Sequence, residues 1–129
     1  MEVVIGSVIA VKSGGKLLLL RRAEDEGKGL WEFPKGTFDA ADITIHETAR
    51  RELKEETGLE ATDMRYMGDM ERSDERRKCV GYAYVVYGFR GEIRLSEEHD
   101  DYRWVERGEI AGYKLDANTL LFLEMYKDF

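Results

Sequence analysis

Three glutamates and one arginine lie close together near the middle of the chain and could carry chemistry. They are Arg51, Glu52, Glu55 and Glu56. Carboxylates three or four positions apart on a helix repel one another, so a positive charge is expected between them. Hard divalent cations such as Mg²⁺ take oxygen ligands and keep coordination positions open for substrate phosphates. The spacing therefore fits a metal site, and it fits equally a solvated helix face on which the charges pair with one another.

The sequence around these side chains predicts a helix over 44–58. Thr44 followed by Glu47 is a capping box, and Gly58 is a typical stop signal. An apolar stripe with helical spacing lies between them and consists of Ile45, Ala49 and Leu53. Glu52 and Glu56 lie along the edge of this stripe, and Glu55 lies further round the helix.

The stretch from Gly36 to Leu59 resembles the signature of the Nudix hydrolases. Its second half, from Arg51, matches the family pattern Arg-Glu-apolar-x-Glu-Glu-x-Gly-apolar at every specified position. The first half departs from the pattern, because fourteen residues separate Gly36 from Arg51, one more than in the family. Asp42 is the acid nearest to the family's first glutamate. We therefore predict a one-residue insertion in the loop 39–43, before the helix.

The resemblance implies a fold and a cofactor. The fold is of the α/β class, a Nudix-type α/β/α sandwich with a mixed β-sheet between helices. The cofactor is Mg²⁺, with Mn²⁺ as the alternative. The implied ligands are the side chains of Glu52, Glu55 and Glu56 and the backbone carbonyl of Gly36. Pro34 fixes the backbone just before this glycine and suits a rigid turn that aims it, although a plain turn is the alternative.

The resemblance also implies roles for other residues in catalysis. Arg51 would orient the glutamate cluster through Glu55, one helical turn on. One of the glutamates, or Glu98, would accept the proton of the attacking water. Glu98 comes from an acidic loop that precedes the Trp104 segment, as in many family members. His46 and His99 are expected to be surface or hydrogen-bonding residues rather than metal ligands.

The expected activity is hydrolysis of a phosphoanhydride bond in a nucleoside diphosphate linked to another group. The Pro34-Lys35-Gly36 step resembles family members that act on diadenosine polyphosphates, diphosphoinositols or capped RNA. Dinucleoside polyphosphates and nucleoside triphosphates are therefore the leading substrate classes, followed by ADP-ribose. The candidate substrate contacts are Arg22, Trp31 and Lys35. A Nudix-like module that binds nucleotides without hydrolysis is the alternative, although the intact glutamate cluster argues against it.

Composition limits the remaining function classes. The chain has 129 residues, expected to form one domain over 1–129, with a net charge of -7. This charge disfavours long nucleic acids as partners and leaves a small-molecule nucleotide as the expected partner. Cys79 is the one cysteine, so no internal disulfide forms, and no apolar run is long enough for a membrane span. We expect a cytoplasmic protein, and a homo-oligomer remains open.

The other elements follow from apolar patterns. Strands are predicted over 3–11, with both faces buried, and over 16–22, joined by a glycine turn into a hairpin. Two later strands are predicted over 64–71 and 79–89. The charged segment 72–78 between them reads as a solvated loop, or alternatively as a polyphosphate-binding one. A final helix is predicted over 116–127, capped by Asp116, with four side chains toward the core: Leu120, Leu121, Leu123 and Met125.

Overall fold

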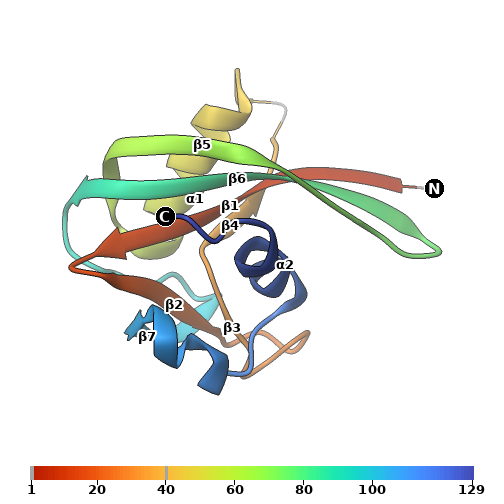
Figure 1. The fold of residues 1–129 in the computed structure, drawn as a ribbon. Helices are drawn as coiled ribbons and strands as arrows, with labels where there is room; N and C mark the ends of the chain where they lie inside the picture. Colours follow the sequence, from red (N-terminus) through yellow and green to blue (C-terminus); the bar gives the residue numbers. More distant parts are fainter. Residues whose placement is uncertain (1, 40) are drawn as a thin grey trace.

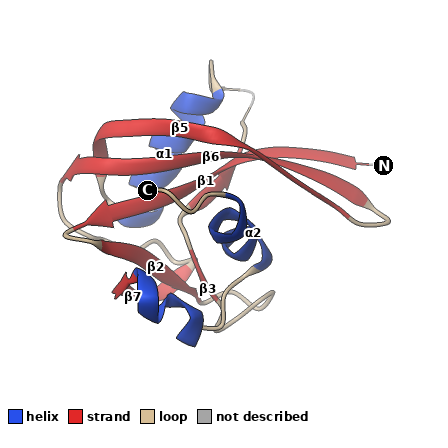
Figure 2. Ribbon diagram, in the orientation of Figure 1, coloured by secondary structure: helices blue, strands red, loops and turns tan. Residues whose placement is uncertain are grey.

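The computed structural model describes residues 2–39 and 41–129, in which one group of strands precedes the first helix and another follows it (Figure 2). In chain order the elements are β1 (Glu2–Ser13), β2 (Lys16–Arg22), β3 (Trp31–Glu32), β4 (Lys35–Thr37), α1 (Ile45–Thr57), β5 (Glu60–Ser73), β6 (Arg77–Arg90), β7 (His99–Glu106), the 3-10 helix η1 (Arg107–Gly112) and α2 (Ala117–Met125). Ala40, part of the predicted insertion loop, lies outside the described residues. No helix among the described residues is long and apolar enough to cross a membrane.

The sheet is mixed and bends at the hairpin between β1 and β2. On one side of the bend, β1 pairs with β4 and β6, and β5 pairs with the far edge of β6. On the other side, β2 pairs with β3 and β7. The β1–β6 pair is parallel and the other pairs are antiparallel. The predicted hairpin of the first two strands and the mixed sheet are confirmed.

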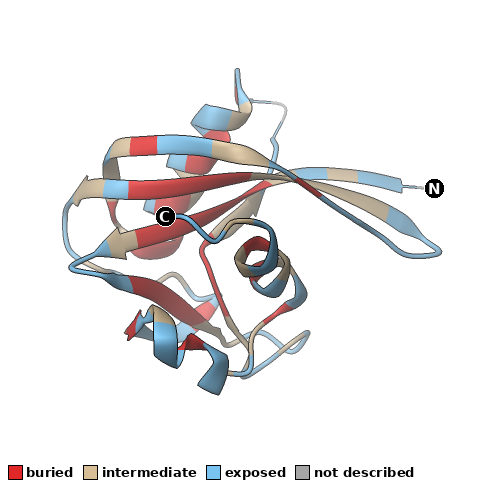
Figure 3. Ribbon diagram, viewed as in Figure 1, coloured by how far each residue is buried: buried red, intermediate tan, exposed pale blue. Residues whose placement is uncertain are grey.

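A hydrophobic core lies on each face of the sheet, because β1 and β2 bury both of their faces (Figure 3). Ile9 and Val11 of β1 pack with Ala49 and Leu53 of α1. The alternate residues of β1 and β2 pack on the other side, with Phe122 of α2. Side chains of a strand point alternately to opposite faces, so a continuous apolar run fills both cores. The two helices lie on opposite sides of the sheet, which confirms the predicted α/β sandwich (Figure 1).

Helix α1 begins and ends where the sequence predicts. The Thr44 side chain accepts a hydrogen bond from the backbone N–H of Glu47 at 3.0 Å. Gly58 ends the helix in the left-handed region, at φ 80°. These local signals fix the start and the end of the segment that carries the glutamate cluster.

Two predictions about the other elements are wrong in detail. The charged segment 72–78 is not a loop, because β5 continues to Ser73 and β6 begins at Arg77. Asp74 closes the tight turn between them, because its side chain accepts hydrogen bonds from the backbone N–H groups of Arg76 and Arg77. In α2 the buried side chains are Thr119 and Phe122. Leu121 and Leu123 are partly buried and pack against the core as predicted, whereas Leu120 and Met125 are exposed. An apolar helix with no polar face leaves its orientation to its neighbours, so sequence alone misplaces the core side.

The first residues of β1 and the β5–β6 hairpin project together beyond the sandwich, at the right of Figure 1. Val3 is 57% exposed and Ile5 37% exposed, which corrects the prediction that this strand is buried throughout. The other face of the projection carries Val4 of β1 opposite Cys79 of β6, with Arg72 of β5 beyond it. This second face forms one wall of the cleft described next.

Candidate active site

Gly36 lies at the centre of β4, packed between β1 and α1. It is opposite Ser7 of β1. A Cβ atom at Gly36 would lie 2.6 Å from Oε2 of Glu52, and closer still to Cγ and Cδ of that side chain. A Cβ atom at Gly6 would lie 3.2 Å from the carbonyl carbon of Gly36, and closer to its oxygen. Glycine at both positions therefore lets the two strands and the helix approach, which brings the backbone of Gly36 against Glu52.

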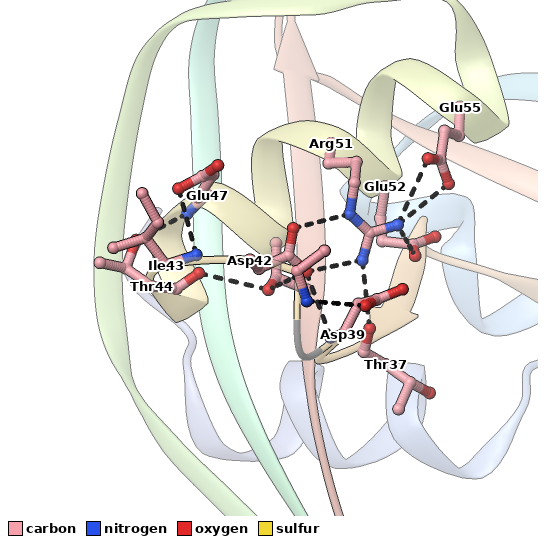
Figure 4. Close-up of polar contacts among 11 residues, drawn as sticks. Thr37, Asp39, Asp42, Ile43, Thr44, Glu47, Arg51, Glu52 and Glu55 are labelled. Atoms are coloured by element: carbon pink, nitrogen blue, oxygen red, sulfur yellow. Dashed lines mark hydrogen bonds and ion pairs between the residues drawn. The ribbon is translucent and has the colours of Figure 1, made fainter.

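Arg51 is the centre of a hydrogen-bond network beside the cleft (Figure 4). Its Nε and Nη2 donate to the two carboxylate oxygens of Asp42 at 2.9 and 2.8 Å. Its Nη1 donates to Glu52 at 2.7 Å and to Glu55 at 3.2 Å. The hydrogen bonds from Arg51 lower the pKa of Asp42 to about 2. The predicted contact with Glu55 is present, and Asp42 is the main anchor because it binds the guanidinium with both oxygens.

Glu52 and Glu56 hold their carboxylates in an environment that disfavours negative charge. Glu56 is 4% exposed, and its Oε1 accepts a hydrogen bond from the backbone N–H of Lys35 at 3.3 Å. Burial raises the pKa of Glu56 well above its ordinary value, and the nearby charges of Glu98, Glu32 and Glu52 raise it further. Burial also raises the pKa of Glu52. A cation bound between these side chains would relieve the cost of their charge.

Glu98 is brought to the cluster by a loop that is tied to the end of α1. The backbone N–H of Ser96 donates to the carbonyl of Glu56 at 3.3 Å. The carbonyl of Glu98 accepts from the backbone N–H of Ala23 at 2.8 Å. The side chain of Glu98 is exposed, and its charge contributes to the raised pKa of both Glu52 and Glu56. The predicted proton acceptor therefore lies beside the buried glutamates.

A second group of charged side chains lies next to this cluster. Arg22 donates to Glu32 at 2.7 Å and to Asp116 at 3.2 Å. The ammonium of Lys35 lies 3.0 Å from Asp116 and 3.3 Å from Glu32. Burial alone would raise the pKa of Asp116, but the charge of Lys35 and hydrogen bonds from Thr119 and Lys35 hold it below its ordinary value. The two cations are thus held in place by carboxylates and remain partly open to solvent.

One cleft, of about 720 Å³, joins the two groups. Six of the predicted site residues line it: Arg22, Lys35, Gly36, Glu52, Glu56 and Glu98. Arg51 and Glu55 lie beside the cleft, and the side chain of Glu55 is 57% exposed. These six predicted site residues therefore meet in one place, although they come from β2, β4, α1 and the loop before β7.

Trp31, predicted as a substrate contact, is not among the residues that line the cleft. Its ring packs edge-on against Tyr113, with centroids 5.3 Å apart, and lies below the guanidinium of Arg21. Neighbouring side chains in a strand point in opposite directions. Because Glu32 of β3 faces the cleft, Trp31 faces away from it.

The sequence reasoning missed two acidic residues of the cleft, and it gave the arginines of segment 72–78 only as an alternative polyphosphate-binding loop. Glu32 and Asp116 were not recognised as partners of the two cations. Arg72 and Arg77 line the far end of the cleft from the β5–β6 hairpin. Reading the segment as a hairpin instead of a loop would have placed these arginines, because they then lie on one face of two adjacent strands.

A divalent cation fits the donors that are present. Glu52, Glu56 and Glu98 offer carboxylate oxygens beside the backbone of Gly36. These are the hard oxygen ligands that Mg²⁺ and Mn²⁺ prefer. The side chain of Glu55 is turned toward Arg51 instead.

Comparison with known proteins decides the family. The family model of the NUDIX domain, which describes the family's sequence pattern, matches residues 2–126 of the chain. The chain belongs to the Nudix hydrolases. This Nudix hydrolase is 32% identical to the CTP pyrophosphohydrolase of Escherichia coli (strain K12) over 117 residues, which cover 90% of the chain and 85% of the relative. It is 37% identical to the asymmetrical bis(5'-nucleosyl)-tetraphosphatase of Mus musculus over 111 residues, which cover 79% of the chain and 74% of the relative.

The fold of this Nudix hydrolase is also found among solved structures. The MutT protein from Methanosarcina mazei Go1 superposes with a TM-score of 0.84 at 26% sequence identity, covering 98% of the chain and 94% of that protein. The family assignment and the enzyme class that the Gly36 to Leu59 signature predicts are thereby confirmed. The chain is a hydrolase with the Nudix fold.

Proposed function

We propose that this Nudix hydrolase cleaves a phosphoanhydride bond of a nucleoside polyphosphate with the help of divalent cations. The observation that carries the proposal is the charge of the cleft. Seven acidic side chains line it, from Glu26 to Asp116, against four basic ones, Arg22, Lys35, Arg72 and Arg77. A polyphosphate would be repelled by such a surface unless added cations reversed the balance. The excess of acids therefore supports metal-dependent binding of a phosphorylated substrate.

The side chains have separate roles in this proposal. Glu52 and Glu56, with the carbonyl of Gly36, would hold the ions, and Glu55 would complete the set at the exposed edge. When bound, the ions would neutralise the phosphate charge and polarise the phosphorus atom that the water attacks. Glu98 is exposed and close to the cluster, so it can accept the proton of the attacking water. Arg51 keeps Glu52 in position through the hydrogen bond between them.

The cations of the cleft would bind the phosphates. Lys35 and Arg22 are held near the acidic cluster by Glu32 and Asp116. Arg72 and Arg77 lie at the projecting hairpin. Charged donors on both parts of the cleft would fit an extended anion with several phosphates.

Dinucleoside polyphosphates are the first substrate class that we propose, and nucleoside triphosphates the second. The first is supported by the Pro34-Lys35-Gly36 step and by the similarity to the mouse tetraphosphatase. The second is supported by the similarity to the bacterial CTP pyrophosphohydrolase, which extends over more of the chain. ADP-ribose is the third class to test.

The experiment is a substrate panel with matched variants. Purified protein is incubated with diadenosine tetraphosphate, the common nucleoside triphosphates and ADP-ribose, with Mg²⁺ or with EDTA, and the products are separated by chromatography. We expect cleavage of one class with Mg²⁺, its loss with EDTA, and its loss in E52Q. E60Q serves as the control, because Glu60 pairs with Lys54 and Arg90 outside the cleft. Cleavage that is equally fast with EDTA would refute the proposal.

A further inference from the structure

The imidazole of His99 is buried at the start of β7 and has one unused nitrogen. Its side chain is 2% exposed. Nε2 lies 2.8 Å from Oε2 of Glu32, whereas Nδ1 is buried and has no hydrogen-bond partner among the residues that the structure describes. Buried polar atoms in proteins nearly always have a partner, and an exception calls for an explanation such as an ion or a water molecule. Of the two alternatives predicted for His99, a surface or a hydrogen-bonding residue, the structure shows the second.

The contact with Glu32 decides which ring nitrogen carries the proton. A carboxylate accepts hydrogen bonds, so Nε2 is the protonated nitrogen of the neutral ring and Nδ1 keeps its lone pair. Arg22 and Lys35 hold the carboxylate of Glu32 from the other side. Histidines that bind metals commonly donate their second ring N–H to a carboxylate in this way, which fixes the ring and its tautomer.

Two further donors lie beside the imidazole. A ring nitrogen of His99 and one carboxylate oxygen each of Glu56 and Glu98 lie within 4.8 Å of one another. Ligands that bind one ion at about 2.1 Å lie at most about 4.2 Å apart. The limit of 4.8 Å is about 0.6 Å longer than this, so small rotations of the three side chains, the exposed Glu98 above all, are enough to bring the donors to that spacing. The three groups can therefore close around a single cation.

We propose that Glu56, Glu98 and His99 form a mixed oxygen and nitrogen site that binds a first-row transition cation, with Mn²⁺ preferred to Mg²⁺. Mg²⁺ favours oxygen ligands, whereas imidazole nitrogen suits the transition ions better. The inference rests on the proposed function in that Glu56 serves both the acidic cluster and this site. It goes further by adding a nitrogen ligand outside the Gly36 to Leu59 signature and by naming the kind of ion.

The test is Mn²⁺ binding to metal-free protein in the absence of nucleotide. Pulsed electron paramagnetic resonance of the Mn²⁺-loaded wild type detects nitrogen coupling from a coordinated imidazole. We expect this coupling in the wild type and in H46Q, and its loss in H99Q. His46 is the matched control, because it is the other histidine of the chain and lies exposed on α1, packed edge-on against Tyr84. We also expect H99Q to weaken Mn²⁺ binding by about 10- to 100-fold and Mg²⁺ binding by much less.

E98Q is a second variant that tests the site even if H99Q fails to fold. Glu98 is exposed, so its amide variant removes one ligand without changing a buried pair, and Mn²⁺ binding should again weaken. A wild-type spectrum without nitrogen coupling, or H99Q that binds Mn²⁺ as the wild type does, would overturn the inference. Either result would mean that Nδ1 faces only a trapped water molecule. Failure of the proposed function looks different: nitrogen coupling is then present, but no nucleotide of the panel is cleaved.

Discussion

Replacing Gly36 by alanine tests how the site is built. The added Cβ would lie 2.6 Å from Oε2 of Glu52 and closer to two carbons of the same side chain. Ordinary contacts between carbon atoms are about 3.5–4.0 Å, so the Glu52 side chain has to move by more than about 1 Å. The strand has little freedom to retreat, because Gly6 of β1 lies against the carbonyl of Gly36 on the other side.

The expected effects follow from that displacement. A misplacement of about 1 Å in an active site can cost about a hundredfold in rate, so kcat/KM of G36A should fall by roughly that factor. Overpacking costs about 1–3 kcal/mol, which corresponds to a melting temperature lower by roughly 3–10 °C for a chain of this size. The assays are nucleotide cleavage with Mg²⁺ and thermal unfolding of the metal-free protein.

G108A is the matched control for this prediction. A Cβ atom at Gly108, in η1, would meet nothing within 4 Å, and its backbone is not in the left-handed region. G108A should therefore keep the kcat/KM and the melting temperature of the wild type. If G36A behaved like G108A in both assays, the close packing of Gly36 against Glu52 would not matter and the reasoning would be refuted.

Three further predictions concern other contacts. Arg51 lowers the pKa of Asp42 from 3.8, its value in the unfolded chain, to about 2 in the folded protein. Their contact therefore stabilises the fold at any pH above 3.8, and this stabilisation is lost as the pH falls from 3.8 toward 2. Urea unfolding should therefore show D42N less stable than the wild type at pH 7 and equally stable near pH 2; a difference that does not change with pH would contradict this. T119V leaves the buried N–H of Phe33 without the acceptor that it now has at 2.9 Å and should cost about 1–3 kcal/mol in urea unfolding, whereas T119S should restore most of it; equal stability of the two variants would show that the hydroxyl is not needed. K35Q should raise KM by roughly tenfold, or about 1.4 kcal/mol, and change kcat little if Lys35 binds phosphate, and an unchanged KM would remove Lys35 from the substrate contacts.

The sequence predicts those parts of the molecule that depend on neighbours along the chain. Helix α1 has its cap at Thr44 and its stop at Gly58, both of which act within one turn. The continuous apolar runs of β1 and β2 likewise indicate strands with two buried faces. The glutamate cluster was found for the same reason, because its members lie on one short helix.

The parts that could not be predicted depend on contacts between distant segments. The pair of Glu32 and His99 joins residues 67 positions apart, and the contact of Lys35 with Asp116 joins residues 81 positions apart. No local pattern in the chain marks such partners. The orientation of α2 was missed because its apolar residues surround the helix, so that the position of Phe122 in the core is set by packing against Phe33 of the neighbouring segment.

The role of Asp42 lies between these cases. The sequence marks it as the acid nearest to the family's first glutamate, one residue further from Arg51 than in the family pattern. The structure shows that the displaced and shorter side chain still reaches Arg51 with both oxygens. The loop therefore keeps the anchor of the arginine despite the insertion.

The most direct test of the account is the turnover of E56Q with Mg²⁺ on the nucleotide that the wild type cleaves fastest. Glu56 is the most buried carboxylate of the cluster, and its amide variant keeps the size of the side chain. We expect kcat to fall by at least about a hundredfold, with unchanged thermal stability or a small gain, while E60Q retains the wild-type rate. A folded E56Q that turns over within a few-fold of the wild type would contradict the assignment of this cleft as the active site.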